Sequence, residues 1–180
     1  MKDEHYLVGF VLGDGMVRRY RKGRCEVKVS DKSREHMEYI ATLFKKIYGV
    51  RPKVQRYGGA WTIRIFRRRV YEAVIQAASK LLRSPDAHSV GGLFDAEGDF
   101  TASKKRLRFT NSNLSIVNMV SKYIGSIHDV NYHVYTRRRE EYCWYVIEIY
   151  GSNVLRLLPY LDLRHPKWFR SSLTPFPKYA

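Results

Sequence analysis

Two acidic residues, Asp14 and Glu97, stand at the ends of two similar segments of the chain. The segments read YLVGFVLGDG over residues 6–15 and SVGGLFDAEG over residues 89–98. Each is apolar and rich in small residues, and each ends in one acid followed by glycine. Such a glycine is typical of a helix that ends in a left-handed C-terminal cap, which would place each acid at the negative end of the helix dipole. That end is unfavourable for an acid, so both residues are candidates for a chemical role.

Small residues one turn apart inside each segment predict that the two helices pack closely against each other. They are Gly9 and Gly13 in the first segment and Gly92 and Ala96 in the second. An interior glycine costs a helix about 1 kcal/mol relative to alanine, and close approach of two backbones offsets that cost. Pairing would crowd two carboxylates with the carbonyls of both helix ends, a repulsion that a bound divalent cation relieves. For one such segment, a chance Asp-Gly turn after a helix is as good an explanation as a chemical role. For two such segments in one chain it is a poor explanation.

The two segments resemble the sequence motif of the LAGLIDADG homing endonucleases. Residues 7–15 keep the motif's leucine, both of its glycines and its penultimate acid. Residues 90–98 use Glu97 as the acid and keep Gly92, Leu93, Asp95, Ala96 and Gly98. The match departs from the family at Leu12, where an acid is common, and at Gly13 and Gly91, where alanine is usual. None of these departures falls on the metal-binding acid.

The resemblance implies an α+β fold built from two pseudo-symmetric αββαββα repeats. In this family the motif helices pack at the interface between the repeats, the antiparallel sheets form a DNA-binding saddle, and the last acid of each motif binds the catalytic metal. The halves are expected at residues 1–83 and 84–180, the second with a C-terminal tail. Two motifs in one chain resemble a fused dimer, so a monomer is expected. The expected metal ligands are Asp14, Glu97 and the backbone oxygens of Gly13 and Ala96.

The chain is strongly basic. Lysine and arginine number 33 against 17 for aspartate and glutamate, a formal net charge of +16, and 14 tyrosines and 3 tryptophans are interleaved with the basic stretches. This composition predicts nucleic acid as the partner. Binding to a membrane surface would concentrate the charge on an amphipathic helix, whereas here it lies mainly in strand-like runs. With no apolar run of about 18 residues and no signal peptide, the expected location is cytoplasmic, or nucleoid-associated in a prokaryote.

The cysteines and histidines indicate neither a structural metal nor nucleophilic catalysis. Cys25 and Cys143 are too few and too far apart for a disulfide framework or a zinc site, so both are expected as free thiols. The six histidines show neither metal-ligand spacing nor a partner serine or cysteine motif. The two motif acids therefore remain the candidate catalytic groups.

Hydrophobic periodicity predicts the elements that position the first acid. Asp3 is expected to cap the first motif helix, which ends near Asp14. In the strand at 24–30, apolar residues alternate with charged ones, so one face should be buried and the other charged. A solvated sheet face would give this alternation in one strand, but its repetition favours a DNA-facing surface. The elements expected after the motif helix are strands at 16–20 and 24–30 around a Lys22-Gly23 turn, a helix at 33–48, strands at 53–57 and 61–66, and a helix at 70–82.

The second half repeats this plan. Ser84-Pro85 is expected to start its motif helix, and the alternating core pattern of residues 61–65 matches that of residues 145–149. The tail from His165 is expected to pack against the second half. The elements expected after the motif helix are strands at 100–103 and 106–110 around a Lys104-Lys105 turn, a helix at 114–124, strands at 131–137 and 142–150, and a helix at 154–161.

In the family, the junction between the second strand and the next helix commonly supplies a polar residue and a lysine close to the cleavage centre. Asp31 and Lys32 match those positions in the first half, although glutamine is more usual than aspartate. Asn111 takes the place of Asp31 in the second half, where no lysine follows. Lys32 could order water or steady phosphate charge, but an exposed lysine at a helix start is an equally good interpretation. Lys104 and Lys105 also stay open for this role.

The outward faces of the strands are expected to lie along DNA. Two ribbons with strands of about 8 residues at about 3.3 Å per residue span roughly 50 to 60 Å, or about 15 to 18 base pairs. Gln55 and Arg64 in the first half differ from Tyr135 and Glu148 in the second, so the target should be asymmetric. The predicted DNA contacts are Arg18, Tyr20, Lys22, Arg24, Glu26, Lys28, Ser30, Lys53, Gln55, Tyr57, Thr62, Arg64, Arg67, Thr101, Ser103, Lys104, Lys105, Arg106, Arg108, Thr110, His133, Tyr135, Arg137 and Glu148.

These features predict a metal-dependent, site-specific double-strand DNA endonuclease that hydrolyses one phosphodiester in each strand. Magnesium suits carboxylate, water and phosphate ligands, manganese could replace it, and calcium is expected to bind without supporting cleavage. Two alternatives stay open. The basic sheets could bind intron RNA as a splicing maturase, since exposed tyrosines can stack on unpaired bases. The other is a DNA-binding regulator of the same fold that has lost cleavage, although retention of both acids counts against it.

Overall fold

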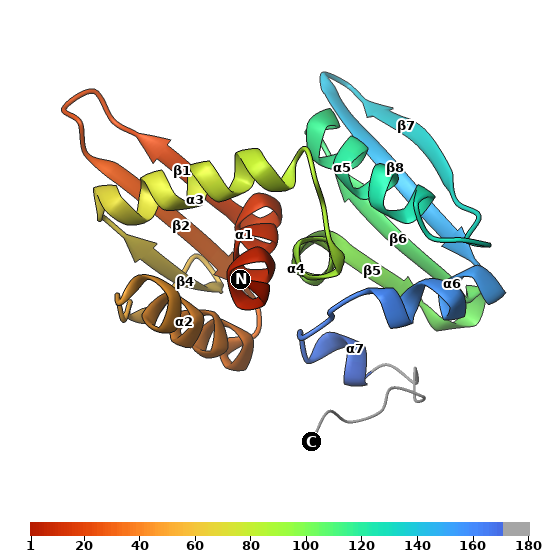
Figure 1. Ribbon diagram of the computed structural model, residues 1–180, viewed down its shortest axis with the longest axis horizontal. Coiled ribbons are helices and arrows are strands. Elements are labelled where there is room, and N and C mark those ends of the chain that lie inside the picture. Colours follow the sequence, from red (N-terminus) through yellow and green to blue (C-terminus); the bar gives the residue numbers. More distant parts are fainter. Residues whose placement is uncertain (171–180) are drawn as a thin grey trace.

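The computed structural model describes the backbone of residues 1–170 and the side chains of residues 1–168, arranged as two similar halves around a central pair of helices (Figure 1). The first half contains α1 (Lys2–Asp14), β1 (Gly15–Arg19), β2 (Cys25–Asp31), α2 (Arg34–Tyr48), β3 (Val54–Tyr57), β4 (Ala60–Ile65) and α3 (Arg68–Leu81). The second contains α4 (Ala87–Glu97), β5 (Gly98–Thr101), β6 (Arg106–Asn111), α5 (Leu114–Gly125), β7 (His133–Arg139), β8 (Tyr142–Tyr150), α6 (Ser152–Leu157) and α7 (Lys167–Arg170). Short 3-10 turns lie at Ala102–Lys104 and Leu158–Tyr160.

Each half contains one antiparallel sheet of four strands, and the two sheets have the same strand order. The order is β1-β2-β4-β3 in the first half and β5-β6-β8-β7 in the second. Val29 lies opposite Ile63 in the first sheet, and Phe109 lies opposite Ile147 in the second. β-branched and aromatic pairs of this kind stabilise the middle strands of a sheet. The predicted α+β fold of two repeats with antiparallel sheets is confirmed.

Helices pack against the sheet of each half, and each half has its own hydrophobic core (Figure 1). In the first half Phe44 of α2 is fully buried with Val29 of β2, and in the second Val120 of α5 is fully buried with Phe109 of β6. Because the apolar side chains of these strands face the helices, the polar side chains that alternate with them face the other way. No helix within residues 1–170 is both long enough and apolar enough to cross a membrane.

The central helices α1 and α4 lie side by side between the halves (Figure 1). A methyl group added at Gly92 would overlap the backbone carbonyl of Tyr6, so only glycine allows the two backbones to approach this closely. Gly13 faces the side chain of Ala96 near the C-terminal ends of both helices. The predicted small-residue interface is confirmed, and it brings the two helix ends together with their acids.

The glycines that follow the two acids do not form the predicted left-handed caps. Gly15 has φ −101° and ψ 164°, and Gly98 has φ −80° and ψ 146°, so both are extended. The prediction is wrong because each helix passes directly into a strand, β1 or β5, with no intervening loop. Glycine is still required at position 15, where a methyl group would overlap the carbonyl of Val11.

Two predicted helix N-caps are also wrong. Asp3 lies in the first turn of α1 and forms ion pairs with basic side chains, while the helix has no side-chain cap. Asp86, not Ser84, caps α4: its Oδ1 accepts the N–H of Ser89 at 2.8 Å, and its own N–H donates to Ser89 Oγ at 3.0 Å. This reciprocal pair is a capping box, which satisfies two backbone N–H groups at once and therefore fixes where α4 begins.

The chain after β8 departs most from prediction. The helix expected at 154–161 is shorter, because α6 ends at Leu157 and continues as a 3-10 turn that includes Pro159. The short helix α7 was not predicted. The tail was expected to pack against the second half, yet it also reaches the first, where His165 Nε2 lies 3.2 Å from Asp31 Oδ2. The tail's last residues, 171–180, lie outside the described part of the chain.

Candidate metal centre and nucleic-acid interface

Asp14 and Glu97 lie half-buried where α1 and α4 end. Burial, followed by the charges of Glu97 and Asp31, raises the pKa of Asp14 to about 7. Burial also raises the pKa of Glu97. Both acids therefore hold their protons more tightly than ordinary carboxylates do. A divalent cation bound between them would relieve the repulsion between their negative charges.

The donors at this position suit a hard divalent cation. Asp14 and Glu97 supply carboxylate oxygens, and the residues before them, Gly13 and Ala96, belong to the last helical turn, whose carbonyls have no partner within the helix. Magnesium prefers carboxylate, water and phosphate oxygens over nitrogen or sulfur. The oxygen-rich donor set and the raised pKa values of both acids therefore fit magnesium or manganese.

Asn111 supports Glu97 from the end of β6. Its Nδ2 donates to Glu97 Oε1 at 3.3 Å, and its Oδ1 accepts the N–H of Asn113 at 2.8 Å. The second bond fixes which end of the amide faces Glu97. Asn111 is thus placed to orient this acid through a neutral hydrogen bond.

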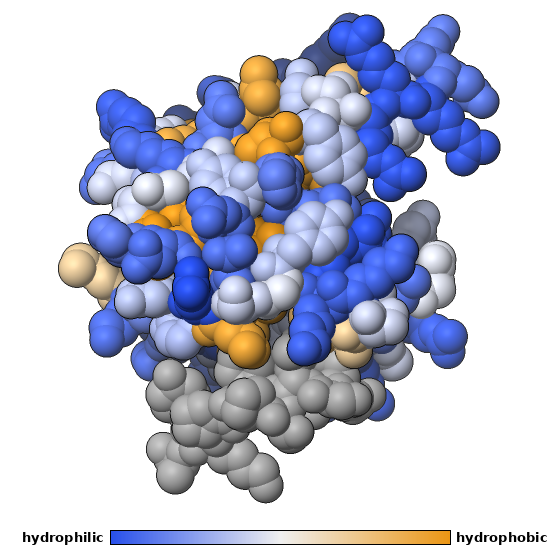
Figure 2. Space-filling view, turned by 90° about the vertical axis from the view of Figure 1, so that its right-hand side faces the viewer, coloured by the Kyte–Doolittle hydropathy of each residue, from blue (hydrophilic) through white to orange (hydrophobic). Residues whose placement is uncertain are grey.

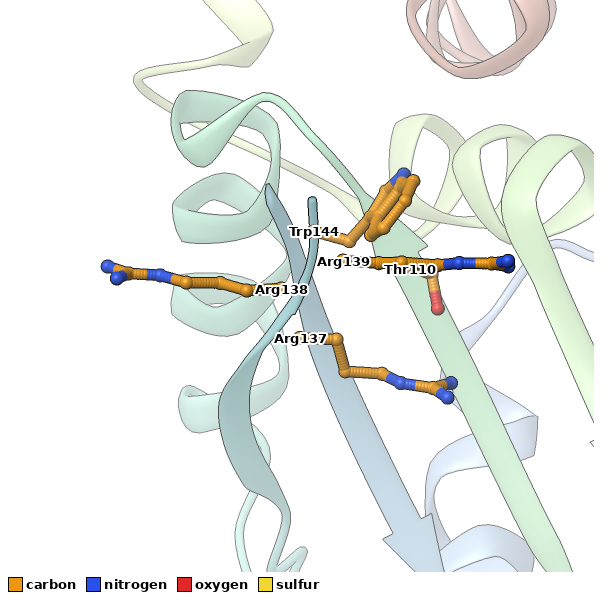
Figure 3. A pocket seen from close by; sticks show the side chains of 5 residues that line it. All are labelled: Thr110, Arg137, Arg138, Arg139 and Trp144. Atoms are coloured by element: carbon orange, nitrogen blue, oxygen red, sulfur yellow. The ribbon is translucent and has the colours of Figure 1, made fainter. Parts of the chain in front are cut away.

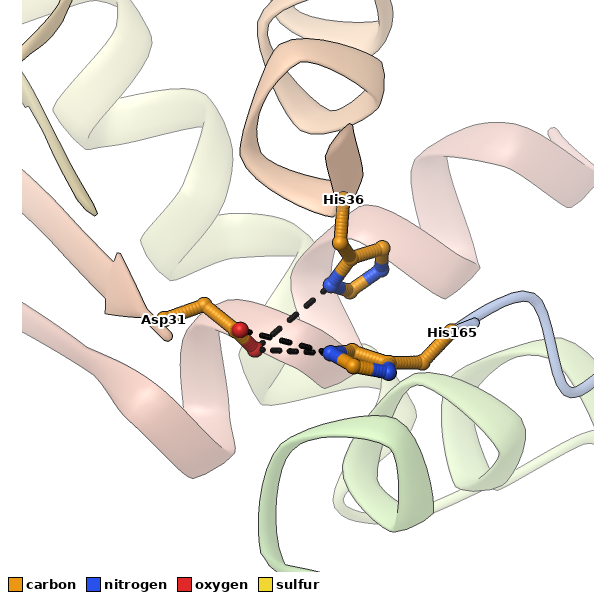
Figure 4. Close-up of side chains that lie close together, drawn as sticks. All are labelled: Asp31, His36 and His165. Carbon is orange, nitrogen blue, oxygen red and sulfur yellow. Dashed lines mark hydrogen bonds and ion pairs between the residues drawn. The ribbon is translucent and has the colours of Figure 1, made fainter. Parts of the chain in front are cut away.

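Asp31 occupies the corresponding place at the end of β2 but has different partners (Figure 4). Its Oδ1 accepts the N–H of Ser33 at 2.5 Å, and its Oδ2 lies 3.2 Å from His165 Nε2 and 3.6 Å from His36 Nδ1. Burial raises the pKa of Asp31, but the hydrogen bonds with His165, His36 and the Ser33 backbone outweigh burial and hold the pKa well below its usual range. Asp31 is therefore ionised at neutral pH and adds negative charge beside Asp14.

Asp31, His36 and His165 also bring three metal-ligating atoms within 4.8 Å of one another (Figure 4). No spacing in the sequence indicated this cluster, because its members come from β2, α2 and the tail. The hydrogen bonds favour a metal-free role. His165 Nδ1 accepts the N–H of Lys167 at 2.9 Å, so the ring proton lies on Nε2 and is donated to Asp31. A metal would need the lone pair of that nitrogen, so the cluster attaches the tail to the first half.

The tail also brings to the acids a lysine that the sequence did not predict. Lys167 Nζ donates to the carbonyls of Asp95 at 2.6 Å and of Gly98 at 2.9 Å, which lie on either side of Glu97. Burial lowers the pKa of Lys167, and the charges of nearby acids oppose that effect, in the order Asp95, Asp31, Asp14 and Glu97. No motif or periodicity indicates Lys167. The one indication is chemical: several acids close together are expected to have a cation nearby.

The lysines that the sequence left open for catalysis are all exposed. Lys104 and Lys105 lie at the tip of the β5–β6 hairpin, at the opposite end of β5 from Gly98. Lys32 lies beside Asp31, where both line an open surface depression. The structure therefore places Lys32 near the surroundings of the first acid, while Lys167 contacts the backbone around the second.

The outer face of the first sheet carries most of the DNA contacts predicted for that half. Glu26 is an exception, because it is fully buried and accepts hydrogen bonds from Arg64 Nε at 2.6 Å and from the Tyr20 hydroxyl. Thr62 is also buried, with its hydroxyl 2.9 Å from that of Ser30. Glu26 and Thr62 are therefore covered in this structure, and their contact with DNA stays a prediction. The depression on this face is lined by Met16, Arg18, Tyr20, Lys28, Gln55, Arg56, Tyr57, Thr62 and Arg64.

The outer face of the second sheet carries a group of exposed arginines on β7 (Figure 3). Arg137 and Arg139 extend to the same side as Thr110 of β6, and Arg138 extends the opposite way. Together with Trp144 these side chains line an open pocket. Arg139 was missed because the strand was expected to end at residue 137, whereas the alternation of β7 continues for two more residues.

Glu148 repeats the arrangement of Glu26 in the second sheet, so it too is covered, and its contact with DNA stays a prediction. It is buried and accepts hydrogen bonds from Arg106 Nη1 at 3.2 Å and from the Tyr150 hydroxyl at 2.5 Å. Figure 2 shows hydrophilic side chains over most of the molecular face on the second half's side, with apolar groups only in small separate patches. The other predicted contacts are exposed or half-buried: Arg18, Tyr20, Lys22, Arg24, Lys28, Ser30, Lys53, Gln55, Tyr57, Arg64, Arg67, Thr101, Ser103, Lys104, Lys105, Arg106, Arg108, Thr110, His133, Tyr135 and Arg137.

Comparison with known proteins supports the motif reading. Residues 84–162 match the family model of the LAGLIDADG-like domain. No curated protein gives a significant match to the chain. Solved structures of I-DmoI are similar: its complex with DNA and Mn has a TM-score of 0.73 at 20% identity, covering 91% of this chain and 98% of that one. Its complex with DNA and Ca has a TM-score of 0.70 at 20% identity, covering 87% and 86%.

A second kind of protein shares the fold. The N-terminal LAGLIDADG domain of DUF199/WhiA has a TM-score of 0.61 at 13% identity, covering 91% of this chain and 83% of that domain. At these identities the likeness to both proteins concerns the fold. The resemblance predicted from the two motifs is therefore confirmed: most of the second half matches the model of the LAGLIDADG-like domain, and the whole chain has the two-repeat fold of the I-DmoI structures.

Proposed function

We propose that this protein is a metal-dependent endonuclease that cuts both strands of a long, asymmetric DNA target. One observation carries the proposal: two helix-terminal acids, Asp14 and Glu97, meet between two basic sheets, and the pKa of each is raised. Buried acids with raised pKa values are costly for stability, and functional sites are where such costs are common. The structurally similar I-DmoI is a homing endonuclease whose structures include complexes with DNA and Mn and with DNA and Ca.

The acid pair is the proposed metal centre. Asp14, Glu97 and the carbonyls of Gly13 and Ala96 would hold magnesium, and manganese could replace it. A bound metal supplies an activated water and stabilises charge on the departing 3′ oxygen. Asn111 orients Glu97 through a hydrogen bond, whereas Asp31 places a negative charge beside Asp14. The two acids therefore differ in their hydrogen bonding and in the charge around them.

The two sheets are the proposed DNA-reading surfaces. Arginine can read guanine and glutamine can read adenine in the major groove, where each good bidentate contact discriminates by about 1 to 3 kcal/mol. The first sheet presents Gln55 and Arg64 to solvent, and the second presents Tyr135 and Arg137. Because these side chains differ, the two halves should prefer different base sequences, which makes the target asymmetric.

The test is to incubate the protein with a sequence-diverse DNA library in magnesium and in calcium, and to sequence all new ends. Discrete ends at one long site, present in magnesium and absent with Glu97→Gln, would support the proposal. Lys80→Met, an exposed lysine on α3, serves as a control for loss of one positive charge. A site that is enriched by binding but never cut would contradict the nuclease. Enrichment of no DNA would favour the RNA-binding alternative.

A second candidate is a DNA-binding protein of this fold that does not cleave. One observation favours it: the ammonium of Lys167 is held by the backbone on either side of Glu97, close enough for the charges of Asp14 and Glu97 to act on it. A lysine ammonium in that position could take the place of the divalent metal ion. The two candidates make opposite predictions for removal of Lys167, because its loss would impair a nuclease but would open the metal site of a blocked one.

A further inference from the structure

The two motif helices differ at the residue two positions before the metal-binding acid. The second motif has Asp95 there, and the first has Leu12. Leu12 is partly buried against the core of the second half, whereas Asp95 is only 1% exposed. An acid buried this completely needs hydrogen-bond donors to compensate for the loss of water. The identity of those donors indicates what Asp95 is for.

The donors to Asp95 come largely from residues 162–168, here called the strap. Asp95 Oδ2 accepts the backbone N–H groups of Arg164 at 2.7 Å and His165 at 2.9 Å, together with the hydroxyl of Tyr6 at 2.5 Å. Asp95 Oδ1 accepts the indole N–H of Trp168. The extra acid of the second motif is therefore the attachment point of the strap.

The strap is attached to the first half as well. Arg164 Nη1 donates to Asp3 Oδ1 at 2.7 Å and to the hydroxyl of Tyr39 at 2.5 Å, and its guanidinium lies 4.3 Å from the centre of the Tyr6 ring. His165 donates to Asp31, as shown in Figure 4. These contacts fix the strap across the junction of the two halves, immediately below the ends of the motif helices.

The fixed strap places Lys167 against the backbone that carries Glu97. The two carbonyls that accept from Lys167 Nζ belong to Asp95 and Gly98, so the ammonium bridges the residues on either side of Ala96 and Glu97. Hydrogen bonds from a charged donor are stronger than those between neutral groups. In the first half, the corresponding carbonyls of Leu12 and Gly15 accept no hydrogen bond from any side chain among residues 1–168.

We propose that Lys167 is a positioning residue for the metal centre: held by the strap, it fixes the Glu97 carboxylate and the Ala96 carbonyl in the orientation that binds the metal. This role rests on the proposed endonuclease function. It assigns a purpose to Asp95 and to the strap, whose contacts with the sheets are at Asp31 of β2 and Gly98 of β5, the strand ends nearest the acids. It also makes the metal centre asymmetric, because the charge of Lys167 acts on both acids while its hydrogen bonds go to the backbone on the Glu97 side.

The test compares Lys167→Met with Lys167→Arg and with Lys80→Met in the full chain, using the target recovered from the library. Single-turnover cleavage is measured across a magnesium series, DNA affinity is measured in calcium, and melting temperature is measured without metal. Lys167→Met should cleave about 10 to 100 times more slowly and need more magnesium, as is usual when a group that orients a metal ligand is lost. Its DNA affinity should be unchanged, Lys167→Arg should regain part of the rate, and Lys80→Met should behave like the parent.

Three results would overturn the inference. Lys167→Met that cuts at the parent rate with the same magnesium dependence would remove the positioning role and leave the nuclease intact. Faster cutting would show that Lys167 takes the metal's place. A parent protein that cuts no DNA would overturn the proposed function and this inference with it. If Lys167→Met melts at a lower temperature, Lys167→Gln, which keeps two N–H donors but no charge, carries the same prediction.

Discussion

The two motif helices, α1 and α4, end in equivalent acids that lie in unequal surroundings. Glu97 accepts a hydrogen bond from Asn111, and Lys167 bridges the backbone on either side of it. Asp14 instead lies near the charges of Glu97 and Asp31, which together with burial raise its pKa to about 7. Hydrogen bonds thus stabilise the surroundings of Glu97, while the carboxylate of Asp14 is repelled by the charges of neighbouring acids.

This difference teaches that the internal repeat explains the acids but not their support. Both acids follow from the repeated motif, whereas Lys167 comes from a strap that has no counterpart in the first half. Asn111 and Asp31 are equivalent by position, but Asn111 is neutral and donates to Glu97, while Asp31 is charged and is held by two histidines. The two sides of the acid pair therefore have different electrostatics.

The largest expected effect comes from removing either acid. Asp14→Asn and Glu97→Gln keep the side-chain shape but remove the negative charge that holds the metal, so each should lower the cleavage rate by about a thousandfold or more. DNA affinity measured without metal should not fall below the parent value, because removing a carboxylate reduces the repulsion between the protein and the DNA phosphates. If one variant still cuts at the parent rate, the two sides are not equivalent in chemistry. Loss of specific binding along with cleavage would mean that the acid is structural.

The pH dependence should expose the Asp14 side. At limiting magnesium, the cleavage rate should rise with pH through about 7, because Asp14 must lose its proton to bind metal and its pKa lies near that value. Below this midpoint the rate should fall about tenfold per pH unit. More magnesium should move the midpoint to lower pH, since the metal competes with the proton. A midpoint that does not respond to magnesium would assign the titration to another group.

The DNA-reading surfaces can be compared by Arg64→Ala in the first sheet and Arg137→Ala in the second. Each should weaken preference at one or two base pairs, by about 1 to 3 kcal/mol, at opposite ends of the target. Profiling cleavage of single-base target variants measures this directly. Uniform weakening at all positions would place the arginine on phosphate. Because Arg64 also pairs with buried Glu26, its variant needs a melting control, whereas Arg137 is fully exposed on its strand.

The smallest expected effect is on stability without metal. The pKa of Asp14 is higher in the folded protein than its ordinary value of 3.8, so the folded state binds this proton more tightly. The contribution of Asp14 to stability is therefore lost as pH rises from about 4 to about 7. Asp14→Asn should stabilise the protein by roughly 1 to 2 kcal/mol at pH 8 and by less at pH 5. Thermal melting at both pH values, with Glu97→Gln alongside, checks whether the Asp14 side is the more strained.

Much of the fold follows from local patterns in the sequence. The two motifs indicate both acids and the pairing of their helices, because small residues at helical spacing allow close packing. Alternation in the strands indicates the sheet faces, and the helix predicted at 33–48 ends as α2 does, at Gly49 in a left-handed cap. These features depend on neighbours within one element or its repeat, which is why sequence reasoning reaches them.

The remaining features depend on residues far apart in the sequence. Glu26 is covered because Arg64, on another strand, folds over it, and no pattern within β2 shows that. The strap depends on contacts of Arg164 with Asp3 and of His165 with Asp31, which no periodicity connects. A short irregular tail with several prolines has no pattern that predicts where it packs.

The most direct test of the proposed metal centre is to map DNA ends produced in magnesium by the parent protein and by Glu97→Gln under identical conditions. A metal-dependent nuclease with its centre at Asp14 and Glu97 predicts a single long site, cut once in each strand by the parent and left intact by the variant. Ends that persist unchanged with Glu97→Gln would place the chemistry elsewhere on the molecule.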